Sequence, residues 1–195
     1  MEKPLRILIA EDEYLCLMGL SANLKQLGHE VIGEAIDGNE LVEIARKNKP
    51  DLIITDINMP LLDGIEAIKK LNEQLIIPSI IVSGYHDREL IEKASKQGVF
   101  NYLIKPIDIQ DLKVAIEITM SKYEEFEKIK SELNDTQNAL KRRKYIEKAK
   151  GILMDRFSLR EDDAMKRLQK MSRDKNKKMI DIAKEIIKAS EILSN

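Results

Sequence analysis

Five polar residues stand where short apolar runs of the chain end. Glu11 and Asp12 follow the first run, Asp56 ends the third, Ser83 ends the fourth and Lys105 follows the fifth. Carboxylates gathered in one place repel one another unless a cation lies among them. Oxygen ligands that leave room for water suit Mg²⁺, so Glu11, Asp12 and Asp56 together predict a magnesium site.

The same residue types could carry a phosphoryl group. A carboxylate on an accessible loop can attack a phosphoryl donor and form an aspartyl phosphate, and Asp56 is placed for that role. The ammonium of Lys105 could neutralise the transferring group, and the hydroxyl of Ser83 could turn toward a phosphate oxygen. Each of these residues alone has a simpler structural explanation. Because all of them stand at strand ends, phosphoryl transfer to Asp56 is favoured.

These residues can meet only if the apolar runs form one parallel sheet. Short apolar runs alternate with segments of helical period from Leu5 to Lys105, which is the pattern of repeated strand–helix units. The predicted strands are Leu5–Ala10, Glu30–Ala35, Leu52–Asp56, Ser79–Ser83 and Phe100–Ile104. The predicted helices are Leu15–Leu27, Glu40–Lys47, Ile65–Asn72 and Arg88–Lys96, with Gly28 and Gly98 as stops.

The fold class that follows is α/β, with a doubly wound, five-stranded parallel sheet. Right-handed crossovers place helices on both faces of such a sheet. Ligands then bind in the crevice beyond the carboxyl ends of the strands. The polar residues at the strand ends are therefore expected at one edge.

Four segments of the chain resemble one protein family in detail. They are Glu11-Asp12, the run from Asp56 to Gly64, Ser83-Gly84 and Lys105-Pro106. Over residues 5 to about 118 the chain resembles the receiver domain of bacterial two-component response regulators, which has a flavodoxin-like fold.

The resemblance assigns a role to each matching residue. It implies that Asp56 is the phosphoacceptor and that a sensor histidine kinase is the donor. It implies that Mg²⁺ is held by Glu11, Asp12, Asp56 and the backbone carbonyl of Asn58. It implies phosphate-binding and switch roles for Ser83, Lys105 and the aromatic Tyr102, and a cis peptide at Lys105-Pro106.

Composition limits the other possibilities. The chain has one cysteine, Cys16, and no apolar run long enough for a signal peptide or a membrane span, so we expect a cytoplasmic protein without membrane contact. No catalytic triad, glycine-rich phosphate loop or zinc cluster is recognisable, and we expect no separate enzyme. The absence of Trp and the 4% aromatic content argue against a base-stacking surface.

Charge divides the chain into two parts. Residues 1–120 carry 13 Lys and Arg against 20 Asp and Glu, whereas residues 121–195 carry 20 against 14. The formal net charge is therefore -7 for the first part and +6 for the second. An acidic part suits a focused metal site, and a basic part without membrane-type apolar periodicity suits a polyanion.

A long helix is predicted between the two parts. From about Asp111 to Lys150 there is no Pro or Gly, and strong helix formers dominate. A heptad seam can be read through Leu112, Ile116, Thr119, Tyr123, Phe126, Lys130, Leu133, Gln137 and Leu140. Six apolar positions of nine favour a coiled coil and a homodimer that forms on phosphorylation, although a solvated spacer helix stays an alternative.

After Gly151 two shorter helices are expected. Ser158-Leu159-Arg160-Glu161 has the spacing of a capping box for the first, and the second is predicted from about Lys178 to Leu193. With the end of the long helix they could pack through Ala149, Ile152, Leu153, Ala164, Leu168, Met171, Ile182, Ala183 and Ile186.

The basic part resembles a second family. Ile146 to Met154, Leu168 to Ser172 and Ile182-Ala183 resemble the ANTAR domain, a three-helix RNA-binding output of antitermination regulators. The resemblance implies binding to paired RNA hairpins in nascent transcripts, which keeps a terminator from forming. The candidate RNA contacts are Arg143, Lys148, Lys150 and Arg156.

We therefore expect a receiver domain over residues 1–118, a helical linker with coiled-coil character over 119–135 and an ANTAR-like domain over 136–195. The expected function is phosphorylation-regulated antitermination. Two alternatives stay open. The output could instead bind DNA, although its helix pair lacks the short glycine-containing turn of a helix-turn-helix, or it could be a protein-interaction adaptor with an acidic partner.

Overall fold

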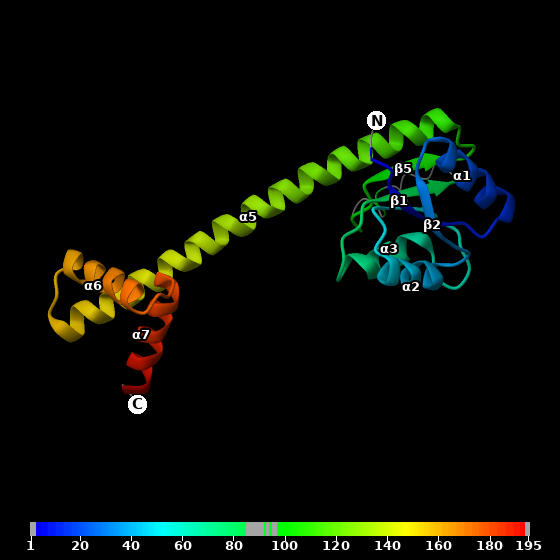
Figure 1. Cartoon of the computed structure of the whole chain (residues 1–195). Helices are drawn as coiled ribbons and strands as arrows, with labels where there is room; N and C mark the ends of the chain where they lie inside the picture. Colours follow the sequence, from blue (N-terminus) through cyan, green and yellow to red (C-terminus); the bar gives the residue numbers. More distant parts are fainter. Residues whose placement is uncertain (1–2, 85–91, 93, 95–96, 194–195) are drawn as a thin grey trace. The chain divides into compact units, whose positions relative to one another are not determined.

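The computed structural model describes residues 3–84, 92, 94 and 97–193 of the chain. They fall into two units, residues 1–127 and 128–195. Helix α5 (Ile109–Phe157) runs across the boundary between the units, as Figure 1 shows. Among the described residues, no helix is both long and apolar enough to cross a membrane.

The first unit is built on a parallel sheet of five strands. Its strands are β1 (Arg6–Ala10), β2 (Glu30–Ala35), β3 (Leu52–Asp56), β4 (Ser79–Ser83) and β5 (Asn101–Ile104). Their order is β2-β1-β3-β4-β5, and every neighbouring pair is parallel. The predicted fold class is confirmed, and each strand begins within one residue of its predicted start.

Side chains that alternate along the strands build two cores, one on each face of the sheet. Leu8 and Ile53 pack on one face with residues of α2 (Gly38–Asn48) and α3 (Gly64–Asn72). Ile7 and Ile54 pack on the other face with residues of α1 (Tyr14–Gln26) and the first turns of α5. This period of two places helices on both faces, as Figure 1 shows. The predicted helix Arg88–Lys96 lies outside the described residues, apart from Glu92 and Ala94.

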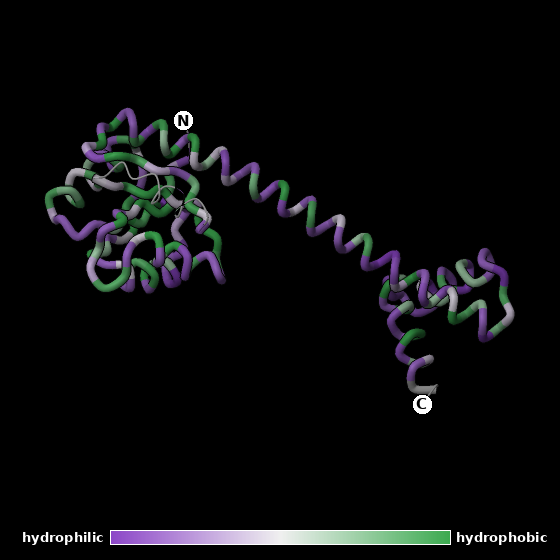
Figure 2. The backbone as a smooth tube through the Cα atoms, turned by 180° about the vertical axis from the view of Figure 1, so that it is seen from behind, coloured by the Kyte–Doolittle hydropathy of each residue, from purple (hydrophilic) through white to green (hydrophobic). Residues whose placement is uncertain are grey.

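The start of α5 belongs to the core of the first unit. Leu112, Ile116 and Thr119 are almost fully buried, and Leu112 and Ile116 pack in the same core as α1. These first three positions of the predicted seam are therefore used within their own domain, because they lie against the sheet. A seam between chains stays a prediction for the part of α5 from Phe126 onward, where hydrophilic and hydrophobic residues alternate (Figure 2).

The helix also continues past the glycine at which we expected it to end. It passes through Gly151 to Phe157, and Leu153 beyond the glycine is buried among residues of the next two helices. Glycine inside a helix costs about 0.5 to 1 kcal/mol relative to alanine. Burying one leucine side chain stabilises by about 1.5 to 3 kcal/mol, so continuation wins.

The capping box predicted at Ser158 is wrong. Ser158 has a left-handed backbone with φ of 51°, and the amide of Leu159 donates to the carbonyl of Met154 at 3.1 Å. This is the pattern of a helix C-terminus, so Ser158 ends α5. Helix α6 (Glu161–Asp174) begins after Arg160, which makes no side-chain cap, and acidic residues fill its first turn.

The second unit packs the end of α5 against α6 and α7 (Met179–Leu193). Ala149, Leu168 and Ala183 are buried at the contacts of the three helices, and small side chains let the backbones approach closely. The predicted packing residues are confirmed as members of this core, with Ile152, Met171 and Ile186 partly buried at its margin.

Candidate phosphoacceptor site and nucleic-acid interface

The carboxyl ends of β1, β3 and β5 bring four charged residues together. Glu11, Asp12 and Asp56 offer carboxylate oxygens that all lie within 4.8 Å of one another. Lys105 Nζ lies 2.7 Å from Asp56 Oδ2 and 2.6 Å from Glu11 Oε2. A role for Lys105 beside the phosphoryl group was predicted from the sequence, whereas its second ion pair, with Glu11, is seen only in the structure.

Burial sharpens the electrostatics of this cluster. Glu11 is 2% exposed and Asp56 is 7% exposed, whereas Asp12 is exposed. Burial raises the pKa of Glu11, and the neighbouring Asp56 adds to this effect against the opposing influence of Lys105. Burial alone would lower the pKa of Lys105, but its hydrogen bonds to Asp56 and Glu11 outweigh that effect and raise it. Lys105 therefore stays protonated at neutral pH.

The backbone after β3 orients the carboxylate of Asp56. The amide of Ile57 donates to Asp56 Oδ1 at 2.6 Å, and the amide of Asn58 lies 3.4 Å from the same oxygen. Oδ1 therefore faces backbone amides and Oδ2 faces Lys105. A carboxylate held from two sides loses little further freedom when it reacts.

Gly64, at the start of α3, lies against the backbone of Asp56, and no role for it was predicted from the sequence. A Cβ there would lie 2.0 Å from the carbonyl oxygen of Asp56 and 2.9 Å from Thr55 Oγ1. Helix α3 thus starts in direct backbone contact with the end of β3. The preceding Asp63 caps the helix by accepting from the amide of Glu66 at 2.7 Å. An Asp-Gly pair ahead of an apolar helical pattern was the available signal.

The remaining predicted switch residues lie at the same edge of the sheet or next to it. Ser83 is the last residue of β4 and is fully buried. Tyr102 in β5 is partly buried and packs with Ile57, which follows Asp56 directly, and with Ile81. The peptide between Lys105 and Pro106 is cis, as the resemblance implied.

The donor set of this cluster fits Mg²⁺. Its carboxylates are oxygen ligands, two of them are buried, and their oxygens lie close enough to share one ion. Mg²⁺ is bound in proteins by one or two carboxylates together with water and phosphate oxygens. The exposed side of the cluster at Asp12 leaves room for those additional ligands.

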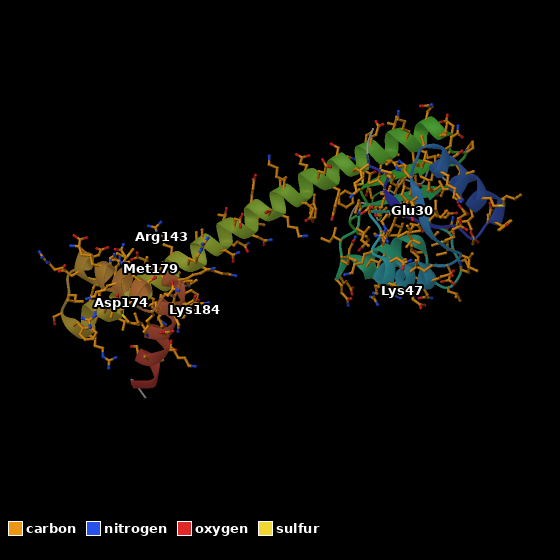
Figure 3. The ribbon with its side chains drawn as sticks, in the orientation of Figure 1. Glu30, Lys47, Arg143, Asp174, Met179 and Lys184 are labelled. Atoms are coloured by element: carbon orange, nitrogen blue, oxygen red, sulfur yellow. The ribbon has the colours of Figure 1, made fainter. Side chains whose placement is uncertain are left out.

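The candidate RNA contacts lie in the second unit and differ in accessibility. Arg143 and Arg156 are exposed, and Arg143 can be seen on α5 in Figure 3. Lys148 is exposed and pairs with Glu191 at 3.2 Å. Lys150 is 9% exposed, and its Nζ lies 2.6 Å from Glu147 and 2.7 Å from Glu161.

The environment of Lys150 changes the expectation for that residue. Hydrogen bonds to Glu147 and Glu161 raise the pKa of Lys150, and Lys150 lowers the pKa of Glu161. Its charge is thus already matched by two carboxylates, Glu147 on α5 itself and Glu161, whose ion pair joins α5 to α6. Contact with RNA stays a prediction for Arg143, Lys148 and Arg156, whereas Lys150 fits better as an ion pair that holds the helices together.

The first unit therefore has the fold and the acidic edge of a receiver. Residues 7–117 match the response regulator receiver domain, and residues 134–187 match the ANTAR domain. The chain belongs to the two-component response regulators that carry an N-terminal receiver domain and a C-terminal ANTAR domain.

Known proteins support this assignment over nearly the whole chain. The transcriptional regulatory protein PdtaR of Mycobacterium tuberculosis is 39% identical over 184 residues, which cover 94% of this chain and 90% of PdtaR. The signal receiver domain of a modulated diguanylate cyclase from Desulfovibrio desulfuricans has a TM-score of 0.58 and 31% identity, over 62% of this chain and 96% of that one. The receiver domain of AraT from Geobacillus stearothermophilus has a TM-score of 0.56 and 30% identity, over 63% of this chain and 98% of that one.

Proposed function

We propose that this response regulator is phosphorylated on Asp56 by a sensor histidine kinase and then binds paired RNA hairpins in nascent transcripts, where it prevents termination. The observation that carries the proposal is the position of Asp56. One of its oxygens is 2.7 Å from Lys105, its neighbours are two further carboxylates, and the same chain carries an ANTAR domain. Such a relay acts where transcripts are made, in the cytoplasm.

The chemistry of the site can be followed atom by atom. A carboxylate oxygen of Asp56 attacks the phosphorus of a phosphohistidine, the phosphorus–nitrogen bond breaks, and an acyl phosphate forms. Lys105 balances the negative charge that gathers on the phosphoryl oxygens. Glu11, Asp12, Asp56 and the carbonyl of Asn58 would hold Mg²⁺, which when bound neutralises the same oxygens. The hydroxyl of Ser83 is the donor proposed for the new phosphate.

Aromatic contacts connect the start of β5 to the long helix. Phe100 stands directly before β5, the strand that ends next to Lys105. Its ring lies 5.6 Å from that of Tyr123 and 6.0 Å from that of Phe126, both on α5. We propose that Ser83, Tyr102 and Lys105 rearrange around the phosphate and that this moves β5. The ring contacts of Phe100 would pass the movement to α5 and change the receiver surface next to that helix.

The first prediction concerns dimer formation through α5. Leu133 and Leu140 are 55% and 71% exposed and are seven residues apart, as residues on one helical stripe are. We expect phosphodonor and Mg²⁺ to double the mass of the full-length chain in sedimentation. Leu133→Glu should abolish the doubling without affecting labelling of Asp56, because it places a charge in the seam.

Asn134→Glu is the matched control, since it adds the same charge one position away from the seam. Wild-type protein whose mass does not change with phosphodonor, over a wide concentration range, would rule out phosphorylation-dependent pairing. Equal behaviour of the two variants would assign the pairing to a different surface.

The second prediction tests RNA binding itself. RNA that co-purifies with the full-length chain is sequenced, and the recovered hairpin pair is compared with scrambled loops and with duplex DNA. Lysine and arginine contacts to phosphate release counterions, so log affinity should fall linearly with log salt, by about 0.7 for each single-strand contact. Arg143→Ala should weaken binding and reduce that slope by about 0.7.

Lys177→Ala is the control, because Lys177 already pairs with Glu185 in α7, and it should change the slope less. Wild-type protein that binds hairpins, scrambled loops and duplex DNA equally would leave a nonspecific polycation and remove the antitermination function. Preference for duplex DNA would favour the DNA-binding alternative, and the absence of any nucleic-acid binding would favour the adaptor.

A further inference from the structure

The second unit has two partly exposed aromatic rings that lie outside its hydrophobic core. Tyr145 is 40% exposed and Phe157 is 47% exposed, and they are the only aromatic residues after Phe126 in the sequence. Each ring is covered by a cation from a neighbouring helix. Lys184 of α7 lies 5.4 Å from the centre of the Tyr145 ring, and Arg167 of α6 lies 4.1 Å from that of Phe157.

Charge distinguishes the two rings as places for RNA. Tyr145 follows directly on the basic run Lys141-Arg142-Arg143-Lys144, all of which is exposed. Phe157 stands shortly before the acidic first turn of α6, formed by Glu161, Asp162 and Asp163. Phosphates are attracted to the first environment, whereas near Phe157 the acidic turn of α6 opposes the attraction of Arg156 and Arg167.

The helix faces around Tyr145 extend the same surface. Lys148 lies one turn after Tyr145 on α5, and Lys188 lies one turn after Lys184 on α7. The pair of Lys148 with Glu191 at 3.2 Å shows that these two faces meet. Figure 3 labels Lys184 on α7 and Arg143 on α5. The ring of Tyr145 is thus set among cations from two helices, with Glu191 as the acidic partner of Lys148.

We propose that Tyr145, with Lys184 beside it, is the stacking platform for one unpaired base of the RNA loop. Unpaired loop bases stack on aromatic side chains, and their phosphates are then held by nearby cations. Lys184 lies over the ring, 5.4 Å from its centre, so its ammonium would move aside when a base stacks there and would then bind the phosphate of that base. This proposal rests on the proposed RNA-binding function and revises the expectation that an aromatic-poor chain has no surface for base stacking.

The test uses the full-length chain with acetyl phosphate and Mg²⁺. The probe is a library of tandem RNA hairpins with constant stems and randomised loops, from which wild-type protein selects its binders. Tyr145→Leu should lower affinity for the selected RNA by about tenfold, whereas Tyr145→Phe should retain it. Phe157→Leu is the matched control and should bind as the wild type does. Affinity for a duplex of the same stem should be equal in all variants.

An abasic loop nucleotide makes the test specific to stacking, because it removes one base and keeps its phosphate. At the stacked position, wild type and Tyr145→Leu should bind the abasic RNA equally. Two results would overturn the stacking role of Tyr145 and leave the proposed RNA binding in place. One is a tenfold lower affinity of Tyr145→Leu on every abasic RNA. The other is wild-type affinity of Tyr145→Leu for the intact loop, with an unchanged melting curve. Wild-type protein that enriches no loop sequence would overturn the proposed RNA function and the platform with it.

Discussion

We expect Asp56→Asn to reduce labelling of the full-length chain by acetyl phosphate and Mg²⁺ to background. The change keeps the size of the side chain but replaces the attacking carboxylate oxygen, so no acyl phosphate can form. We do not expect Glu11 or Asp12 to substitute, because Asp56 is the carboxylate that Lys105 and the backbone amides of Ile57 and Asn58 orient from two sides. Retained radioactive phosphate on gel-purified protein measures the result.

Asp51→Asn is the matched control. Asp51 directly precedes β3, the strand that ends at Asp56, and it accepts a hydrogen bond from the amide of Arg6 at 2.8 Å. It should be labelled as the wild type is. Label that persists in Asp56→Asn at the wild-type rate would refute Asp56 as the phosphoacceptor. Undiminished labelling of wild-type protein in excess chelator would remove Mg²⁺ from the proposed reaction.

Gly64→Ala should destabilise the receiver by about 3 kcal/mol, at the upper end of what overpacking usually costs. The added methyl group would meet the backbone carbonyl of Asp56 at 2.0 Å, and a backbone atom cannot move aside as a flexible side chain does. Thermal unfolding measured by circular dichroism should show the receiver transition at least about 10 °C lower. The displaced end of β3 should also slow labelling of Asp56.

Gly19→Ala provides the comparison within the same domain. Gly19 lies inside α1, and an added Cβ meets no atom within 4 Å. Alanine there should stabilise by about 0.5 to 1 kcal/mol, because it restricts the unfolded chain. If the two variants unfold at the same temperature, the close contact of α3 with the end of β3 does not contribute to stability as we infer.

The strands of the sheet and the residues of the acidic edge could be predicted from local patterns. Strands that are buried on both faces are continuous apolar runs, and polar residues such as Asp56 and Lys105 mark their ends. The family motifs then assigned roles that composition could not. The role of Gly64 was missed because only the fold shows which backbone atom lies next to it.

Helix ends in the second unit were harder to predict because tertiary contacts compete with local preference. Gly151 and Ser158 both carry local signals for a boundary, a glycine stop and a cap. Burial of Leu153 carries α5 through Gly151, and the left-handed backbone of Ser158 ends this helix rather than starting the next. A weak local preference loses when continuation buries a large apolar side chain.

By itself, the sequence determined the class of the fold, the strand ends at which the proposed phosphoacceptor site lies and the separation into an acidic and a basic part. These depend on residue type and on spacing along the chain. The tertiary structure alone decided which charges are paired and which apolar positions are already buried. From the sequence Lys150 is one more exposed cation, but the structure pairs it with Glu147 and Glu161. Leu112 has the spacing of a seam residue, but it is buried in the core on one face of the sheet. Partners and burial come from residues distant in sequence, and no local pattern contains them.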